Sequence, residues 1–285
     1  MTQKKFHREE YPLETLNEFG LSPEMVYDLP NFVHETLEMG GKSPLLPILI
    51  PQPFGVTRCY AKFQLVRLDG GVDLLFSPKL KAIDLSQFSE GEQDMLFDGK
   101  AIVADVMESD LDANGTSIPT KVKSFVQLDR ETNAAVYAPT AIIGKNLSLV
   151  CSEFDISDSS LEGFWHGYPV TIEEPDVFGN LHKITIGIDL FSDKGVIALP
   201  CDAAQWQSAM RRQMPEYSFG NDGCWVNRNG LLHYVKETDF GSDIINELER
   251  QARKAGMTTE GVMDNVHDIG LGEMAAKDIM RQMGR

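Results

Sequence analysis

The sequence predicts an α+β fold built from repeated small units. Each unit is one helix on a three-stranded antiparallel meander, and helical segments lie at the N- and C-termini. Three observations lead to this prediction: apolar residues recur at helical spacing near both ends of the chain, strand-type alternation fills the middle, and a helix–glycine–strand pattern occurs more than once. The chain has 285 residues, 42% of them hydrophobic and 24% charged, which is typical of a globular protein and excludes a wholly disordered or fibrous one.

Short helices are expected near the N-terminus, at Leu13–Phe19, Pro23–Leu29 and Asn31–Met39. Ser22 precedes Pro23, so a capping hydroxyl stands before a proline that needs no hydrogen-bond partner for its nitrogen. Asn31 is expected to cap the third helix. Gly40 and Gly41 are expected to end it, because glycine accepts the left-handed backbone of a helix C-terminus.

Alternating β-branched and aromatic residues predict strands at Leu45–Ile50, Cys59–Leu68, Val72–Phe76, Ala101–Met107, Val122–Leu128, Ala134–Tyr137, Pro169–Ile172, Lys183–Ile188 and Val196–Leu199. Asp69-Gly70-Gly71 joins the second and third of these in a hairpin. A further hairpin is expected at Cys224–Val235, with Asn229-Gly230 at or beside its tip.

The helical period returns at Ser242, where Ile244, Ile245, Leu248, Ala252 and Ala255 are expected to fall on one stripe that Gly256 ends. A final helix is expected at Glu273–Met283.

Loops at Gly40–Pro44, Pro139–Ser148 and Pro215–Gly223 are the expected boundaries. They suggest five segments: 1–83 (N-terminal helices and first β unit), 84–145 (second repeat unit), 146–201 (third repeat unit), 202–238 (helix and β-hairpin) and 239–285 (C-terminal helices).

The internal repeat rests on two capping boxes, Ser89–Glu92 and Ser159–Glu162, in which serine and glutamate each bond the other's backbone amide. Each box starts a helix that ends at a glycine, Gly99 or Gly167. Two strands follow, and an aspartate, Asp129 or Asp189, then opens a turn into a third strand. A weaker first copy runs from Gly40 to Asp69. We expect the second and third units to superpose and to share a core.

Charge limits the function classes. With 43 acidic and 26 basic residues the net charge is −17, which disfavours direct binding to nucleic acid or to an anionic membrane. Residues 84–115 and 151–193 each hold nine acidic residues and one lysine, whereas 51–83 is locally basic. No apolar stretch is long enough to span a bilayer, and no secretory signal is visible. Four isolated cysteines indicate reduced thiols, so a cytoplasmic location is expected.

One motif suggests a metal. Asp110, Asp112 and Asn114, followed by Gly115, match the opening of a calcium-binding loop. The twelfth position, which should supply a bidentate glutamate, is Lys121. The alternative interpretation, a polar hairpin tip, is favoured, so the sequence predicts no cofactor.

The remaining motifs are incomplete. Gly41-Lys42-Ser43 lacks the first glycine and the preceding strand of a phosphate loop, and Gly270–Ala275 lacks the strand of a dinucleotide site. His267-Asp268 has no second histidine cluster beside it. Phe164 and Trp165 are interpreted as core residues. The sequence therefore gives no catalytic residues.

Several segments together resemble a known group of proteins: Tyr11-Pro12-Leu13, Leu45-Leu46-Pro47, Leu96-Phe97-Asp98-Gly99-Lys100 and Val126-Gln127-Leu128-Asp129-Arg130-Glu131-Thr132-Asn133. They are similar to uncharacterised proteins, in domain-of-unknown-function families, that are carried on mobile elements of gut anaerobes. The resemblance spans residues 9 to 200. It implies an accessory role in DNA transfer or processing.

The leading hypothesis is therefore a non-enzymatic binding or adaptor protein of a mobile element or phage, acting through contacts with a protein partner. Two alternatives stay open at this point. One is a hydrolase whose site is assembled from distant residues, and the other is an acidic inhibitor that imitates DNA. Partner identity and oligomeric state are open.

Overall fold

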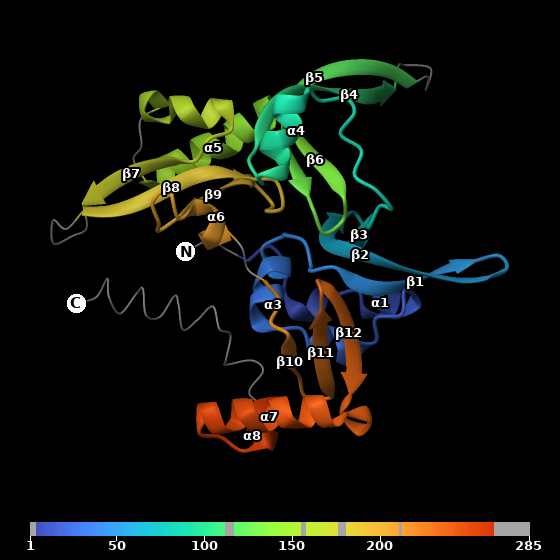
Figure 1. Ribbon diagram of the computed structural model, residues 1–285. Helices are drawn as coiled ribbons and strands as arrows, with labels where there is room; N and C mark the ends of the chain where they lie inside the picture. Colours follow the sequence, from blue (N-terminus) through green and yellow to red (C-terminus); the bar gives the residue numbers. More distant parts are fainter. Residues whose placement is uncertain (1–3, 112–116, 155–157, 176–180, 211–212, 265–285) are drawn as a thin grey trace. The chain divides into compact units, whose positions relative to one another are not determined.

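The computed structural model describes residues 4–111, 117–154, 158–175, 181–210 and 213–264 (Figure 1). Within these residues the protein is α+β, as predicted, with four three-stranded antiparallel sheets whose strands follow chain order. The strands are β1 (Leu46–Gln52), β2 (Gly55–Leu68), β3 (Gly71–Pro78), β4 (Ile102–Leu111), β5 (Ser117–Asp129), β6 (Ala134–Pro139), β7 (Val170–Pro175), β8 (Leu181–Asp189), β9 (Gly195–Leu199), β10 (Tyr217–Phe219), β11 (Gly223–Arg228) and β12 (Leu231–Lys236).

The helices are α1 (Leu13–Glu18), α2 (Pro23–Tyr27), α3 (Asn31–Glu38), α4 (Glu90–Phe97), α5 (Thr140–Phe154), α6 (Trp206–Met210), α7 (Ser242–Ala255) and α8 (Thr259–Asp264), with short 3-10 helices η1 (Arg8–Glu10), η2 (Asp158–His166) and η3 (Glu237–Asp239). Among the described helices, none combines the length and apolar character needed to cross a bilayer. The predicted helix at Glu273–Met283 lies outside the described residues.

The N-terminal helices match the prediction except at one cap. Ser22 caps α2, and its hydroxyl accepts a hydrogen bond from the amide of Met25. The expectation that Asn31 caps α3 is wrong, because Pro30 occupies the cap position in an extended conformation and Asn31 is the first helical residue. The Asn31 side chain instead accepts a hydrogen bond from Arg8 at 3.0 Å.

The loop expected at Pro139–Ser148 is wrong as well, since α5 starts at Thr140. Ile143, Leu147, Val150 and Cys151 are all buried in one cluster. Their spacing is a helical stripe, and its burial against two sheets outweighs the weak helix propensity of the glycine and asparagine between them.

Three of the sheets are preceded by a helix that ends at a glycine, and the three glycines have the same backbone geometry. Gly40, Gly99 and Gly167 have φ of 82°, 76° and 85°. In each case the glycine amide bonds the carbonyl three residues back, and the next amide bonds the carbonyl five residues back from itself, at 2.8–3.1 Å. This is a Schellman cap. The first half of the repeat is thus confirmed in all three copies.

The second and third sheets also share their register. Ile102, three residues after Gly99, pairs with Val126, three before Asp129. Val170, three after Gly167, pairs with Ile186, three before Asp189. Three residues further along each first strand, an acidic residue lies opposite a lysine, in the pairs Asp105–Lys123 and Glu173–Lys183. The predicted correspondence of these units is confirmed.

The copies differ in two respects. The helix that ends at Gly167 is the 3-10 helix η2, with a kink at Leu161, rather than an α-helix. The capping box of α4 at Ser89 is present, whereas the side chain of Ser159 lies outside the described residues. In the first copy, the amide of Ser43 bonds Phe63, six residues before Asp69, so its register is shifted by three residues.

The chain divides into two compact units. Unit 1 comprises Met1–Lys79 and Arg212–Arg285, and unit 2 comprises Leu80–Arg211. In unit 2, α5 and η2 pack between the sheets β4-β5-β6 and β7-β8-β9, and form a core that includes Phe125, Phe164 and Ile186. The loop before α4 and α4 itself cover the other face of β4-β5-β6. Phe164 is fully buried as predicted, but Trp165 is 44% exposed, so its interpretation as a core residue is wrong.

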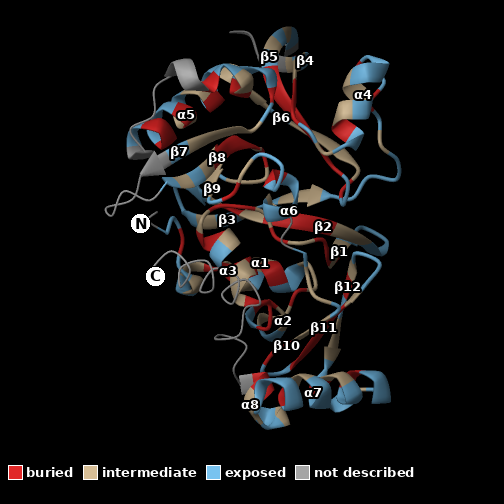
Figure 2. Cartoon of the chain, turned by 60° about the vertical axis from the view of Figure 1, so that its left-hand side comes forward, coloured by how far each residue is buried: buried red, intermediate tan, exposed pale blue. Residues whose placement is uncertain are grey.

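Unit 1 also buries both faces of its C-terminal sheet, β10-β11-β12. Trp225 and Leu232 join the core formed by α1–α3 and β1–β3, while Cys224 and Val226 pack under α7 and α8. Figure 2 shows buried residues running along the central strands and the inner faces of the helices. The expectation that C-terminal helices cover exposed sheet is confirmed for α7, which ends in a left-handed Gly256 as predicted. Of its predicted stripe, Ile244, Leu248 and Ala252 are buried, whereas Ile245 and Ala255 are exposed, so their placement on the buried face is wrong.

Candidate functional site

The residues proposed for calcium are only partly described. The backbone of Asp110 lies near the end of β4, opposite Ile118, but its side chain is not described. Asp112 and Asn114 lie outside the described residues. Among the residues that are described, no group of three or more histidine, cysteine or acidic side chains could hold a metal ion. The described residues therefore do not test calcium binding, which the sequence disfavours.

The phosphate-loop fragment has a structural role. Ser43 is buried, its amide bonds the carbonyl of Phe63, and its hydroxyl accepts a hydrogen bond from the Phe63 amide at 2.9 Å. The segment thus docks the end of α3 onto β2. Gly270–Ala275 and His267-Asp268 lie outside the described residues.

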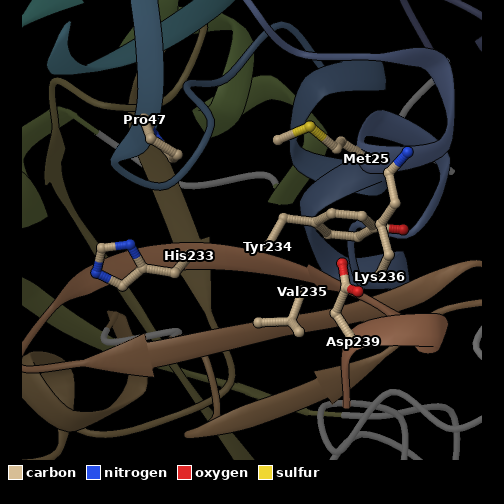
Figure 3. A pocket seen from close by; sticks show the side chains of 7 residues that line it. All are labelled: Met25, Pro47, His233, Tyr234, Val235, Lys236 and Asp239. Atoms are coloured by element: carbon tan, nitrogen blue, oxygen red, sulfur yellow. The ribbon is translucent and has the colours of Figure 1, made fainter. Parts of the chain in front are cut away.

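A hollow of about 460 Å³ lies in unit 1, along the outer strand β12 (Figure 3). Four consecutive residues of β12, His233 to Lys236, line it. Met25 from α2, Pro47 from β1 and Asp239 from η3 complete the lining. Four consecutive strand residues can share one hollow only along the edge of a strand, because side chains alternate between the two faces of a sheet. The hollow therefore borders the backbone of β12.

Tyr234 is fixed in place at this hollow. Its hydroxyl donates a hydrogen bond of 2.5 Å to Asp28, and its ring packs edge-on to Trp225 with centroids 5.2 Å apart. Trp225 is fully buried and donates from its indole nitrogen to the carbonyl of Met25 at 2.9 Å. These contacts join β11 and β12 to α2, and they hold one side of the hollow rigid.

The Asp28 carboxylate accepts two further hydrogen bonds, from the amides of Asn221 (2.7 Å) and Asp222 (3.1 Å). A side chain at Gly220 would overlap this carboxyl group, so the loop can wrap it only with glycine there. Burial raises the pKa of Asp28, and the hydrogen bonds from Tyr234, Asp222 and Asn221 act against that rise. Burial and the hydrogen bond to Asp28 raise the pKa of Tyr234 in turn. This cluster is a structural latch.

The free edge of β12 can be derived from its hairpin. Asn229 and Gly230 have φ of 56° and 80°, a two-residue turn of the type that suits a hairpin. The flanking pair, Arg228 and Leu231, therefore exchanges hydrogen bonds. From Leu231 onward the residues of β12 alternate: Leu231 directs its backbone N–H and C=O groups toward β11, the next residue directs them away from β11, and so on. The amide of Glu237 donates a hydrogen bond to the carbonyl of Asp222, so Glu237 also points toward the neighbouring chain segment, as this alternation requires.

The outward set of β12 consists of Leu232, Tyr234 and Lys236. In the part of the chain that the structure describes, no hydrogen bond satisfies their outward N–H and C=O groups. Tyr234 and Lys236 are the two members of this set that line the hollow. The hollow thus has four unpaired backbone groups along one side.

The edge strand β1 is protected by contrast, and β3 is protected at one position only. Counting from the turn at Pro53 and Phe54, the outward nitrogens of β1 belong to Pro47, Leu49 and Pro51. The prolines carry no N–H, and the Leu49 amide bonds the carbonyl of Phe19 at 2.7 Å. On β3, the outward amide of Leu74 is bonded by the carboxylate of Asp73 at 2.8 Å. Such devices prevent a further strand from pairing with an edge.

The ends of the hollow carry charge. Lys236, His233 and Asp239 are exposed, and His233 lies edge-on to the ring of Tyr60 at 6.2 Å between centroids. The carboxyl group of Glu24 has a lowered pKa, chiefly because Ser22 donates a hydrogen bond to it, with a smaller contribution from the charge of Lys236. Lys236 follows Tyr234 by two residues in β12, so its side chain lies on the same face of the strand, on the α2 side.

Sequence reasoning did not identify this site. The hairpin that contains β12 was predicted, but the hollow depends on Met25 and Pro47, about 200 residues away in the chain. One signal was available: prolines at alternate positions of β1 show which strand edge is protected, and β12 has none.

Comparisons with protein-family models, with curated proteins and with solved structures found no match. The geometry of the site therefore stands by itself. It offers unpaired backbone groups, an apolar wall from Met25, Pro47 and Tyr234, and the charged side chains of Lys236 and Asp239. These are the features with which proteins bind extended polypeptide.

Proposed function

We propose that this chain is a non-enzymatic binding protein that acts through contact with another protein, and that the hollow beside β12 receives the partner. The observation that carries the proposal is the contrast between edges. Proline and Phe19 protect β1, whereas β12 has no such protection and the outward groups of its Tyr234 and Lys236 face the hollow.

The resemblance of residues 9 to 200 to proteins of mobile elements supports a partner among the proteins of DNA transfer or processing. The net charge of −17 supports a protein partner rather than the nucleic acid itself. In this role the chain is an accessory adaptor of a mobile element or phage, located in the cytoplasm.

The test is affinity purification of the tagged full-length protein from its native host, followed by mass spectrometry. Three chains are compared: the unmodified protein, Lys236→Glu, and Lys254→Glu as the control. Lys254 lies on the exposed side of α7 in the same unit, so the control makes the same charge change away from the hollow.

A partner that is recovered with the unmodified chain and with Lys254→Glu, and is lost with Lys236→Glu, supports the proposal. Recovery of no partner, or of the same partners with all three chains, overturns it.

A further inference from the structure

We propose that β12 binds an extended segment of its partner as a fourth, antiparallel strand. The segment has an acidic residue opposite Lys236 and, two residues further along, an apolar residue opposite Tyr234. This inference rests on the proposed function and specifies the chemistry of the partner.

The backbone of β12 determines the mode of binding. Tyr234 and Lys236 each direct one N–H and one C=O group outward, which are the four groups that an antiparallel neighbour would pair. Every strand pair in this sheet is antiparallel. Pairing would satisfy four polar groups that have no partner among the described residues, and this is how edge strands recognise extended peptides.

The side chains determine the pattern of the segment. Tyr234 and Lys236 lie on the α2 face of β12, two residues apart, and Met25 forms the wall above them. Residues directly opposite on neighbouring strands interact, so an apolar side chain would meet Tyr234 and Met25, and an acidic one would meet Lys236. In an antiparallel segment the acidic residue comes first.

The rigidity of Tyr234 supports recognition of an alternating pattern. Asp28 holds its hydroxyl and Trp225 holds its ring, so the side chain of Tyr234 loses no conformational freedom when the segment binds.

The chain offers a substitution that tests the backbone by itself. Lys236 has φ −66° and ψ 151°, the conformation that proline adopts, and its N–H points away from β11. Lys236→Pro therefore removes an outward N–H without straining the strand or breaking its ladder. Lys236→Ala removes the same side chain but keeps the N–H, and is the matched control.

The first measurement is capture of the host partner by full-length Lys236→Pro and Lys236→Ala. Strand addition predicts at least a tenfold weaker capture by Lys236→Pro than by Lys236→Ala, with equal thermal stability of the two variants. Equal capture by the two variants overturns strand addition, and leaves the proposed function standing if Lys236→Glu still abolishes capture.

The second measurement uses the capped pentapeptide Thr-Glu-Val-Leu-Thr, titrated into the isotope-labelled full-length chain and followed by the amide shifts of Tyr234 and Lys236. We expect N-methylation of its Glu or Leu to weaken binding at least tenfold, because those amides would face β12. N-methylation of its Val should change binding less than twofold, because that amide would point away.

The reversed peptide Thr-Leu-Val-Glu-Thr has the same composition and should bind at least fivefold more weakly. Equal loss on methylation at all three positions, or equal binding of the two peptide orders, overturns the inference. If the host experiment recovers no partner while the peptide shows the alternating effect, the proposed function fails and strand addition stands.

Discussion

Tyr234 donates a hydrogen bond of 2.5 Å to Asp28, a residue 206 positions earlier in the chain. The bond joins the last strand of unit 1 to the loop after α2, and the same carboxylate holds the amides of Asn221 and Asp222. Three parts of unit 1 therefore depend on one buried side chain, which makes Asp28 the first residue to test.

Asp28→Asn should destabilise the protein by about 2–4 kcal/mol, because an amide has one acceptor oxygen where three donors converge and leaves a buried donor unpaired. Urea unfolding, followed by tryptophan fluorescence in a chain where Trp165 and Trp206 are replaced by phenylalanine so that the buried Trp225 reports alone, measures the loss. Asp222→Asn is the control, because the Asp222 side chain is exposed and only the backbone amide of Asp222 bonds Asp28. This substitution should change stability by less than about 0.5 kcal/mol. Equal effects of the two substitutions would contradict the latch.

Asp28 should also give unit 1 a pH dependence of a definite sign. Burial raises its pKa in the folded state, so the folded protein holds this proton more tightly than the unfolded chain does. This contribution to stability is complete below the unfolded pKa of about 4, falls as the pH rises through the folded pKa, and is constant above it.

Unfolding free energies of the unmodified protein and of Asp28→Asn, measured from pH 3.5 to 7, isolate this effect from the other carboxyl groups. The difference between the two proteins should become smaller as the pH rises. A difference that grows with pH would show that the carboxylate, stabilised by its hydrogen bonds, is the preferred folded form.

Gln127 joins the two sheets of unit 2. Its side-chain amide donates to the carbonyl of Ile188 at 3.1 Å and accepts from the amide of Leu190 at 2.7 Å, as a peptide group of a neighbouring strand would. Gln127→Leu should cost about 1–3 kcal/mol for each backbone group left unpaired. Hydrogen exchange should accelerate at the Leu190 amide and stay unchanged at the Phe191 amide, which Asp189 bonds independently. Unchanged exchange at Leu190 would refute the role of Gln127.

The repeated glycines predict an unequal response to one substitution. Alanine at Gly99 or Gly167 must adopt a left-handed backbone, which costs about 1–2 kcal/mol. At Gly167 the new methyl group would also overlap the carbonyl of Ala101, whereas at Gly99 it would meet only the Gln207 side chain at 3.3 Å. Gly167→Ala should therefore destabilise unit 2 more than Gly99→Ala.

Thermal unfolding of the two variants measures this order. Gly91→Ala is the control, because Gly91 lies inside α4 with open space around it, so alanine should stabilise the helix by about 0.5–1 kcal/mol. Equal costs at Gly99 and Gly167 would contradict the packing of Ala101 against Gly167.

Local sequence signals were sufficient to predict most helix ends and strands, and insufficient to predict how these elements pack together. Ser22, Ser89, Gly99 and Gly167 set helix ends through contacts within a few residues, and those ends were predicted. The helix α5 was missed although Ile143 and Leu147 begin a stripe at helical spacing, because Pro139 and Gly144 were interpreted as loop signals. The hollow was missed for a different reason: it exists only where β12 lies beside Met25 and Pro47.

The division of the chain has a consequence for synthesis on the ribosome. Unit 2 is one continuous stretch, Leu80–Arg211, whereas the core of unit 1 includes Trp225 and Leu232, which follow unit 2 in the sequence. Phe6, Leu16 and Phe63 are therefore synthesised before unit 2, and two of their packing partners are synthesised after it. The middle of the protein can fold while its beginning is still unfinished, so a stop codon near residue 211 would release a folded unit 2 attached to an incomplete N-terminal half of unit 1.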